Sequence, residues 1–140
     1  MAFAAIVDAS AMVALFGRDQ AEHPRYSALF AQAAQEHWSL TSTWPCITEA
    51  SYLLGLPHRF AFLRWVAADG LSIFPFDQSN LEGMAELMRR YTESPRTEMD
   101  FADASLVYLA SDTGVNRIMT SDVRDFSRYR LADGRAFEIL

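Results

Sequence analysis

The sequence predicts one α/β domain in which helices cover both faces of a short, mostly parallel sheet. Of its 140 residues, 51% are apolar, which is enough for a core without disulfide bonds. Short apolar runs alternate with longer segments whose apolar residues recur at helical spacing, and this alternation is typical of parallel sheets. No repeat, low-complexity tract or linker divides the chain. We therefore expect a single domain over residues 1–140.

The first half of the chain predicts two strands and four helices. Residues 3–7 form an apolar run that is brief enough for a buried strand and that ends at Asp8. A helix follows over 9–16, and Gly17 stops it. Apolar residues at helical spacing predict further helices over 22–36, from Pro45 to Leu54 and over 58–68, whereas 38–42 form a short strand.

The second half predicts three strands and two helices. The strands are expected over 71–76, 117–120 and 136–140. Ser79 is expected to cap a helix that runs to about Tyr91. The polar stretch 92–98 contains Pro95 and predicts a loop. The second helix is expected over 100–111, with Gly114 as its stop.

The charge and cysteine content exclude several classes of function. The net charge of −6 argues against binding nucleic acid over the whole surface. All twelve basic residues are arginines, so a P-loop and Schiff-base catalysis are excluded. The single cysteine, Cys46, fits a reducing cytoplasm. The N-terminal residues are apolar, but they lack a basic flank, and Asp8 interrupts the apolar run. We therefore expect neither a signal peptide nor a membrane span there.

Carboxylates follow the expected strands and open the expected helices. Asp8 ends the first strand and Asp122 follows a late one, while Glu49 and Asp103 fall near helix starts. In a doubly wound sheet these positions share one rim, where ligands bind. Each acid also has a structural explanation. Asp8 and Asp100 can cap the helices that follow them, Asp125 can be a surface residue or a second acid beside Asp122, and Glu49 can be an exposed helix position.

Taken together, the acids favour a cation site. Two carboxylates about 5 Å apart repel by roughly 3 kcal/mol at an effective dielectric constant of 20, so converging acids must take up protons or hold a cation. Ligands that offer only oxygen select Mg²⁺ or Mn²⁺. Zinc is disfavoured, because Cys46 stands alone and the three histidines, His23, His37 and His58, lack ligand spacing.

Three segments of the sequence resemble the PIN-domain family, especially its VapC-like toxin ribonucleases. They are IVDASAMVALF at the start, TEASYLL around Glu49, and MDFADASLVYLASDTGVNRIMTSDVRDFSRYR near the end. The resemblance runs from Ile6 to Arg130 and implies a three-layer α/β/α PIN-like fold. It implies a catalytic quartet of Asp8, Glu49, Asp103 and Asp122. Asp8, Asp103 and Asp122 would bind the metal directly or through water, and Glu49 would either bind it or orient the attacking water.

The resemblance also leaves some positions open and suggests supporting groups. Either Asp122 or Asp125 completes the quartet, and Asp100 is an additional acid at the rim that could act through water. Ser10 and Thr120 supply hydroxyls beside the site. Arginines at the rim are candidates for RNA contacts, with Arg124 and Arg128 foremost and with Arg89, Arg90, Arg96 and Arg130 as further candidates.

The function that the resemblance implies is a Mg²⁺- or Mn²⁺-dependent endoribonuclease, the toxin of a type II toxin–antitoxin pair. Its partners would be an RNA substrate, an antitoxin protein and a second copy in a homodimer. Two alternatives are a catalytically silent PIN-fold binding module and a metal-dependent phosphatase. A partner surface would account for the large apolar groups of the helices over 22–36 and 50–68, namely Tyr26, Phe30, Tyr52, Phe60, Phe62 and Trp65.

Overall fold

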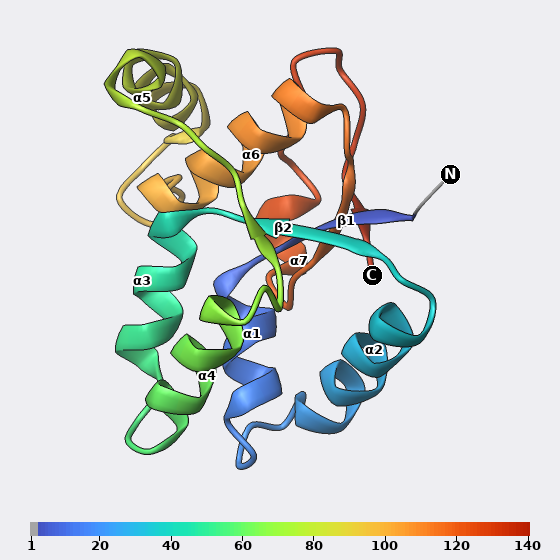
Figure 1. Cartoon of the computed structure of the whole chain (residues 1–140). Coiled ribbons are helices and arrows are strands. Elements are labelled where there is room, and N and C mark those ends of the chain that lie inside the picture. The colour runs from blue at the N-terminus through green and yellow to red at the C-terminus, as the bar shows by residue number, and fades with distance from the viewer. Residues whose placement is uncertain (1–2) are drawn as a thin grey trace.

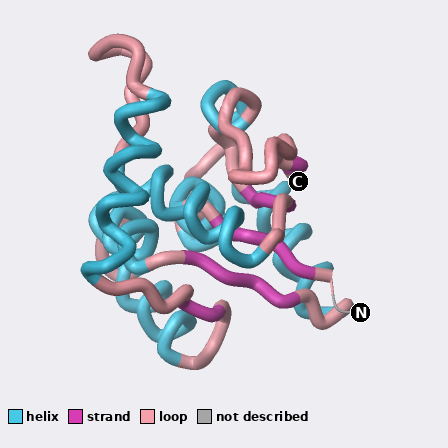
Figure 2. The backbone as a smooth tube through the Cα atoms, turned by 90° about the horizontal axis from the view of Figure 1, so that it is seen from above, coloured by secondary structure: helices cyan, strands magenta, loops and turns pink. Residues whose placement is uncertain are grey.

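The computed structural model describes residues 3–140, which form one five-stranded sheet with all strands parallel (Figures 1 and 2). Each of the five predicted strands is present, although each is shorter than expected. Across the sheet the order is β3 (Ser72–Ile73), β2 (Ser39–Ser42), β1 (Ala4–Val7), β4 (Arg117–Met119) and β5 (Glu138–Ile139).

Seven α-helices connect and cover these strands within the described residues. They are α1 (Ala9–Phe16), α2 (His23–Gln35), α3 (Trp44–Leu53), α4 (His58–Ala67), α5 (Leu81–Tyr91), α6 (Phe101–Thr113) and α7 (Val123–Phe126). Figure 1 shows α1, α2 and α4 below the strands and α5 and α6 above them. The predicted three-layer α/β/α architecture is therefore confirmed. Within residues 3–140, no helix has both the length and the apolar character that a membrane span needs.

The order of the strands reverses between β1 and β4. The chain builds outward from β1 through β2 to β3, then crosses back to place β4 on the other side of β1. Crossovers on the two sides therefore leave in opposite directions, which opens a crevice at the carboxyl ends of β1 and β4. Backbone pairing holds these ends in register, with Val7 opposite Met119 and the Asp8 N–H donating to the Met119 carbonyl at 3.0 Å.

The core is packed around β1 and α6. Ala5, Ile6 and Val7 of β1 are buried, as a central parallel strand requires. Helix α6 buries seven of its residues, and its sequence mixes small residues with Leu106 and Leu109 so that it can lie close to the sheet. Gly114 ends α6 with a φ of 78°, the left-handed conformation that glycine adopts without strain.

Two local predictions are wrong, and both have a clear physical reason. Ser79 does not cap the helix before Tyr91; Asp77 accepts the Ser79 N–H at 2.9 Å and begins a short 3₁₀ turn, Gln78–Asn80, that leads into α5. The four-residue helix α7 was not expected, because one helical turn is too short to show a period in the sequence.

Most of the six large apolar groups suspected of facing a partner belong to the core. Tyr26, Phe30 and Phe62 are buried, and Trp65 is partly buried against Phe16, Phe30 and Phe62. Only Tyr52 and Phe60 are exposed, at 81% and 55%. Four of the six groups are therefore core residues, and the expectation that some of the six face a partner remains open for Tyr52 and Phe60.

Replacing Gly70 with alanine is expected to destabilise the fold. A Cβ atom at this position would lie 2.2 Å from the Trp65 ring, which is held between Phe16, Phe30 and Phe62. Overpacking of this kind costs about 1 to 3 kcal/mol of unfolding free energy, which urea denaturation measures. The matched control is Gly55→Ala, because a Cβ there meets nothing within 4 Å. Equal midpoints for the two variants would contradict this packing argument.

Candidate metal centre

A cavity of about 250 Å³ lies at the crevice between the carboxyl ends of β1 and β4. Its lining comes from β1 and α1, from α3, from the start of α6 with the loop before it, and from α7. Seven of its ten lining residues are acidic, and none is basic. These acids are Asp8, Glu49, Glu98, Asp100, Asp103, Asp122 and Asp125.

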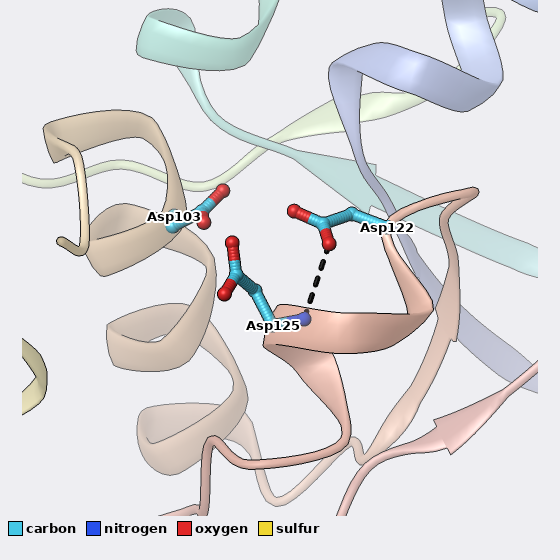
Figure 3. Close-up of side chains that lie close together, drawn as sticks. All are labelled: Asp103, Asp122 and Asp125. Carbon is cyan, nitrogen blue, oxygen red and sulfur yellow. Dashed lines mark hydrogen bonds between the residues drawn. The ribbon is translucent and has the colours of Figure 1, made fainter. Parts of the chain in front are cut away.

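Three of these carboxylates form the tightest cluster. Asp103, Asp122 and Asp125 each present an oxygen atom within 4.8 Å of the others (Figure 3). Asp103 lies in the first turn of α6, and the other two come from the start of α7. Asp122 caps α7 by accepting the backbone N–H of Asp125 at 3.1 Å. The cap therefore fixes the second and third acids relative to each other.

Asp8 lines the same cavity but is held by the protein on several sides. It is only 6% exposed, and one carboxylate oxygen accepts the Ala9 N–H at 2.7 Å. The other oxygen accepts the hydroxyls of Ser10 at 2.9 Å and Thr120 at 2.7 Å. The helix-cap explanation and the site explanation thus hold together, because the hydrogen bonds orient a carboxylate that also faces the cavity.

Asp103 receives a hydrogen bond that the sequence did not reveal. The hydroxyl of Tyr129 donates to its Oδ2 at 2.8 Å. Tyr129 is fully buried and packs edge-on against Tyr91 and Phe126, so its hydroxyl has little freedom to move. One oxygen of Asp103 is therefore tied to the protein core, which leaves the other directed toward the acids of α7.

Asp100 and Glu49 lie at the edge of the cavity. Asp100 is exposed and caps α6, as expected, by accepting the Asp103 N–H at 2.8 Å. Glu49 lies in the second turn of α3 and is partly buried. Glu98, in the loop before α6, also reaches the cavity. Sequence reasoning missed Glu98 because a charged residue in a polar loop is ordinarily a solvated one.

Burial and mutual repulsion raise the pKa of the central acids. The pKa of Asp103 rises to about 8, mainly through burial and then through the charges of Asp100 and Asp8. Burial is also the main cause of the raised pKa values of Asp8, Glu49 and Asp122. Acids held together in this way favour either a proton or a cation.

The donor set fits a hard divalent cation. Every ionisable group that lines the cavity is a carboxylate, and the remaining polar side chain is the hydroxyl of Ser10. Oxygen ligands of this kind suit Mg²⁺ and Mn²⁺, whereas zinc sites typically use histidine and cysteine. Cys46 is buried, and burial raises the pKa of its thiol.

The arginines proposed for RNA contacts differ in their surroundings. Arg128 is largely committed to the protein, since its Nε donates to Asp125 at 3.3 Å and its guanidinium also reaches the Tyr91 carbonyl at 3.1 Å. Arg89 pairs with Glu86, and Arg130 bonds to the carbonyls of Ser127 and Tyr129. Arg124 is exposed on α7 beside Asp125, which makes it the better placed of the two foremost candidates.

The chain is thus a doubly wound α/β domain with a cavity of carboxylates at the switch point of its sheet, which is where ligands bind in this class of domains. The family model for the PIN domain matches residues 5–131. The chain therefore belongs to the PIN-domain family.

Solved structures share this fold. VapC20 from Mycobacterium tuberculosis, a Sarcin-Ricin loop cleaving toxin, is similar with a TM-score of 0.75 at 18% sequence identity, covering 86% of this chain and 92% of that one. PAE2754 from Pyrobaculum aerophilum is similar with a TM-score of 0.58 at 20% identity, covering 99% of this chain and 92% of that one. At these identities the similarity shows a common fold. No curated protein sequence matches the chain.

All six acids expected from the sequence line one cavity, with Ser10 among them and Thr120 bonded to Asp8. The sequence left open whether Asp122 or Asp125 completes the quartet. The geometry does not separate the two, because both lie beside Asp103. Tyr129 and Glu98 are the two residues of this site that the sequence did not predict. Tyr129 belongs to an aromatic cluster and has the sequence environment of a core residue.

Replacing Tyr129 with phenylalanine is expected to weaken metal binding while leaving the fold intact. The change removes only the hydroxyl that orients Asp103, at a cost of about 1 kcal/mol of stability. Loss of a group that orients a metal ligand lowers metal affinity by roughly 10-fold or more. Calorimetric titration with Mn²⁺ measures this change.

Tyr91→Phe is the matched control for that titration. The Tyr91 ring packs against Tyr129 at 5.1 Å between centroids, but its hydroxyl accepts the Arg130 backbone N–H and touches no acid. Tyr91→Phe should therefore retain the parent affinity for Mn²⁺. The same loss of affinity in both variants would mean that the aromatic packing matters and the hydroxyl of Tyr129 does not.

The metal-free protein is expected to lose stability as the pH rises from 3.8 to about 8. Folding raises the pKa of Asp103, so the folded chain binds its proton more tightly than the unfolded chain. The resulting stabilisation is complete below pH 3.8 and disappears as the pH passes the folded value. Thermal melts in EDTA across this range measure the effect, and saturating Mg²⁺ should reduce it.

The variant Asp103→Asn separates the loss of stability caused by ionisation of Asp103 from the effects of other titrating groups. The amide cannot ionise, so the variant should melt higher than the parent at the alkaline end by roughly 3 °C or more in EDTA. Its melting temperature should also depend less on pH. A parent protein whose metal-free melting temperature does not fall across this range would contradict the raised pKa.

Proposed function

We propose that this PIN domain is a divalent-metal-dependent endoribonuclease that hydrolyses RNA phosphodiester bonds. The observation that carries the proposal is the convergence of seven carboxylates, without a basic residue, on one cavity at the switch point of the sheet. Carboxylates this close together repel one another, and a bound cation offsets that repulsion. A divalent cation would do so and would also interact with the phosphate of an RNA substrate.

Asp8, Asp103 and Asp122 would hold the Mg²⁺ or Mn²⁺ ion, with Asp125 beside them and Asp100 acting through water. When bound, the ion would polarise the phosphate and offset its negative charge. The hydroxyls of Ser10 and Thr120 and the phenol of Tyr129 keep the carboxylates in place by donating to Asp8 and Asp103.

Glu49 would orient the attacking water and accept its proton. Its pKa is raised, chiefly by burial and then by the charges of Asp100 and Asp8, which makes the carboxylate a better base than a solvated glutamate. No side chain needs to act as the nucleophile. Ser10, the hydroxyl on the cavity wall, donates to Asp8 and so helps to hold that carboxylate in place.

The biological setting that we propose is a type II toxin–antitoxin pair in the cytoplasm. The fold shared with VapC20, a Sarcin-Ricin loop cleaving toxin, supports a toxin. An antitoxin and a second copy in a homodimer would cover exposed apolar surface, for which the aliphatic and aromatic side chains of Leu53, Leu56, Phe60 and Leu63 on and beside α3 and α4 are suited. Arg124 would contact the RNA backbone at the rim.

The two alternatives account less well for the cavity. A silent binding module would not need to keep every acid together. A phosphatase with an aspartate nucleophile would need a lysine, and the sequence has none.

Asp8→Asn is expected to lower the rate of RNA cleavage by at least about 100-fold, because the loss of a ligand exceeds the roughly 10- to 100-fold effect of groups that only orient one. Cleavage of labelled structured RNA with Mg²⁺ or Mn²⁺ measures the rate, and EDTA should abolish it. Asp112→Asn, at an exposed acid near the far end of α6, should retain full activity. Cleavage that resists EDTA, or an active Asp8→Asn protein, would disprove the proposal.

A further inference from the structure

An apolar groove of about 750 Å³ lies between α3 and the start of α6, which Figure 1 shows side by side. We call it the aromatic groove, after its four large side chains Trp44, Tyr52, Phe76 and Phe101. Trp44 is 59% exposed and Phe101 is 39% exposed, and the phenol ring of Tyr52 is more exposed still. Among the described residues, neither the Trp44 nor the Tyr52 side chain makes a hydrogen bond within the protein.

The aromatic groove adjoins the acidic cavity. Glu49 and Asp100 line both, so they form the ridge between the two. Whatever occupies the groove therefore lies directly beside a phosphate that is cut in the cavity. One carboxylate oxygen of Asp100 caps α6 by accepting a hydrogen bond from the Asp103 N–H at 2.8 Å. The other oxygen is available to accept a hydrogen bond from a ligand in the groove.

The charges of the groove exclude some occupants. None of its lining residues is basic, and two are carboxylates, so a phosphate would be repelled there. A nucleobase has the complementary character. Its faces are apolar and stack on aromatic side chains, and the amino groups on its edge donate hydrogen bonds to carboxylates. Trp44 adds an indole N–H donor for the acceptors of a base.

We propose that the aromatic groove is a subsite for an unpaired, amino-bearing nucleobase of the RNA, adjacent to the phosphate that is cut. The proposal rests on the proposed ribonuclease function, which it deepens by stating how the substrate is held. Trp44 and Tyr52 stack on the base, and Asp100 accepts from its amino edge. The subsite selects single-stranded or splayed nucleotides, because a paired base cannot offer both its faces and its edge.

A protein partner fits the groove less well than a base does. A protein that covered the groove would bury Glu49 and Asp100, and no residue that lines the groove is basic and able to pair with them. The groove itself offers flat rings and acceptors. An occupant that is another protein is nevertheless a distinct outcome of the experiment below.

The experiment mixes the protein and Mg²⁺ with short single-stranded RNAs that carry 2-aminopurine at each position in turn. Stacking in the groove quenches the fluorescence on mixing, and gels of the same samples follow cleavage. Tyr52→Ala and Trp44→Ala are expected to raise the Kd for RNA by roughly 5- to 100-fold, as the loss of one stacked base does. Neither variant should change the melting temperature or the affinity for Mn²⁺, since both rings are exposed.

Leu81→Ala is the control, because Leu81 is a large apolar residue that is 44% exposed and lies outside both the groove and the surface proposed for a partner. It should bind RNA as the parent does. An RNA with an abasic nucleotide at the quenched position should bind the parent weakly by the same factor. That RNA should lose no further affinity with Tyr52→Ala, because the base and the ring act as a pair.

Two results with the groove variants would overturn the subsite. One is an unchanged RNA affinity in both groove variants. The other is loss of self-association in these variants by sedimentation with unchanged RNA affinity, which would assign the groove to a protein. Quenching that depends on Tyr52 without any cleavage would keep the subsite and refute the ribonuclease. Cleavage without quenching would refute the subsite and keep the ribonuclease.

Discussion

The pairing of β1 with β4 is the constraint on which the candidate site depends. The ladder that sets Val7 opposite Met119 continues through the Asp8 N–H to the Met119 carbonyl, and the next residue of that strand is Thr120. The hydroxyl of Thr120 then donates to Asp8 at 2.7 Å, across 112 positions of sequence. A slip of this register would carry Asp8 and the α7 acids away from each other, since side chains alternate between faces along a strand. The site is therefore a product of the sheet rather than of any loop.

Such a site opposes folding unless something offsets its charge. The chain offsets part of it with hydrogen bonds, because a backbone N–H at each helix start and three hydroxyl groups donate to Asp8, Asp100, Asp103 and Asp122. These donors stabilise the charged carboxylates, yet burial still raises the pKa values of Asp8, Asp103 and Asp122. The remaining imbalance is what a cation would remove. Under the proposed function, stability given up in the metal-free protein would become affinity for the metal, which is the usual relation between strain and function at preorganised sites.

Much of this arrangement could be predicted from the sequence, and the rest could not for physical reasons. A buried parallel strand is a short apolar run, so the acid at its end is visible at Asp8 and near Asp122. The resemblance to PIN domains then identified Glu49, which as a lone acid on a helix carries no signal of its own. Tyr129 was invisible because its hydroxyl acts from within an aromatic cluster and its neighbours in sequence do not reveal Asp103 as its partner. Helix α7 was not predicted, because a single helical turn is too short to show a period of apolar residues.

The strong negative charge of the protein bears on how it could hold RNA. An enzyme that gathers seven acids at its cavity cannot also surround that cavity with a continuous basic surface, and Arg128 is already engaged with Asp125. A large part of the affinity for RNA would then come from forces that do not depend on charge, beside the contact proposed for Arg124. Stacking supplies such a force, at about 1 to 3 kcal/mol for each base, and it depends little on salt because no counterion is released. RNA binding by this chain should accordingly survive added salt better than binding by a basic nuclease. A steep loss of affinity with salt would instead point to phosphate contacts at arginines such as Arg124.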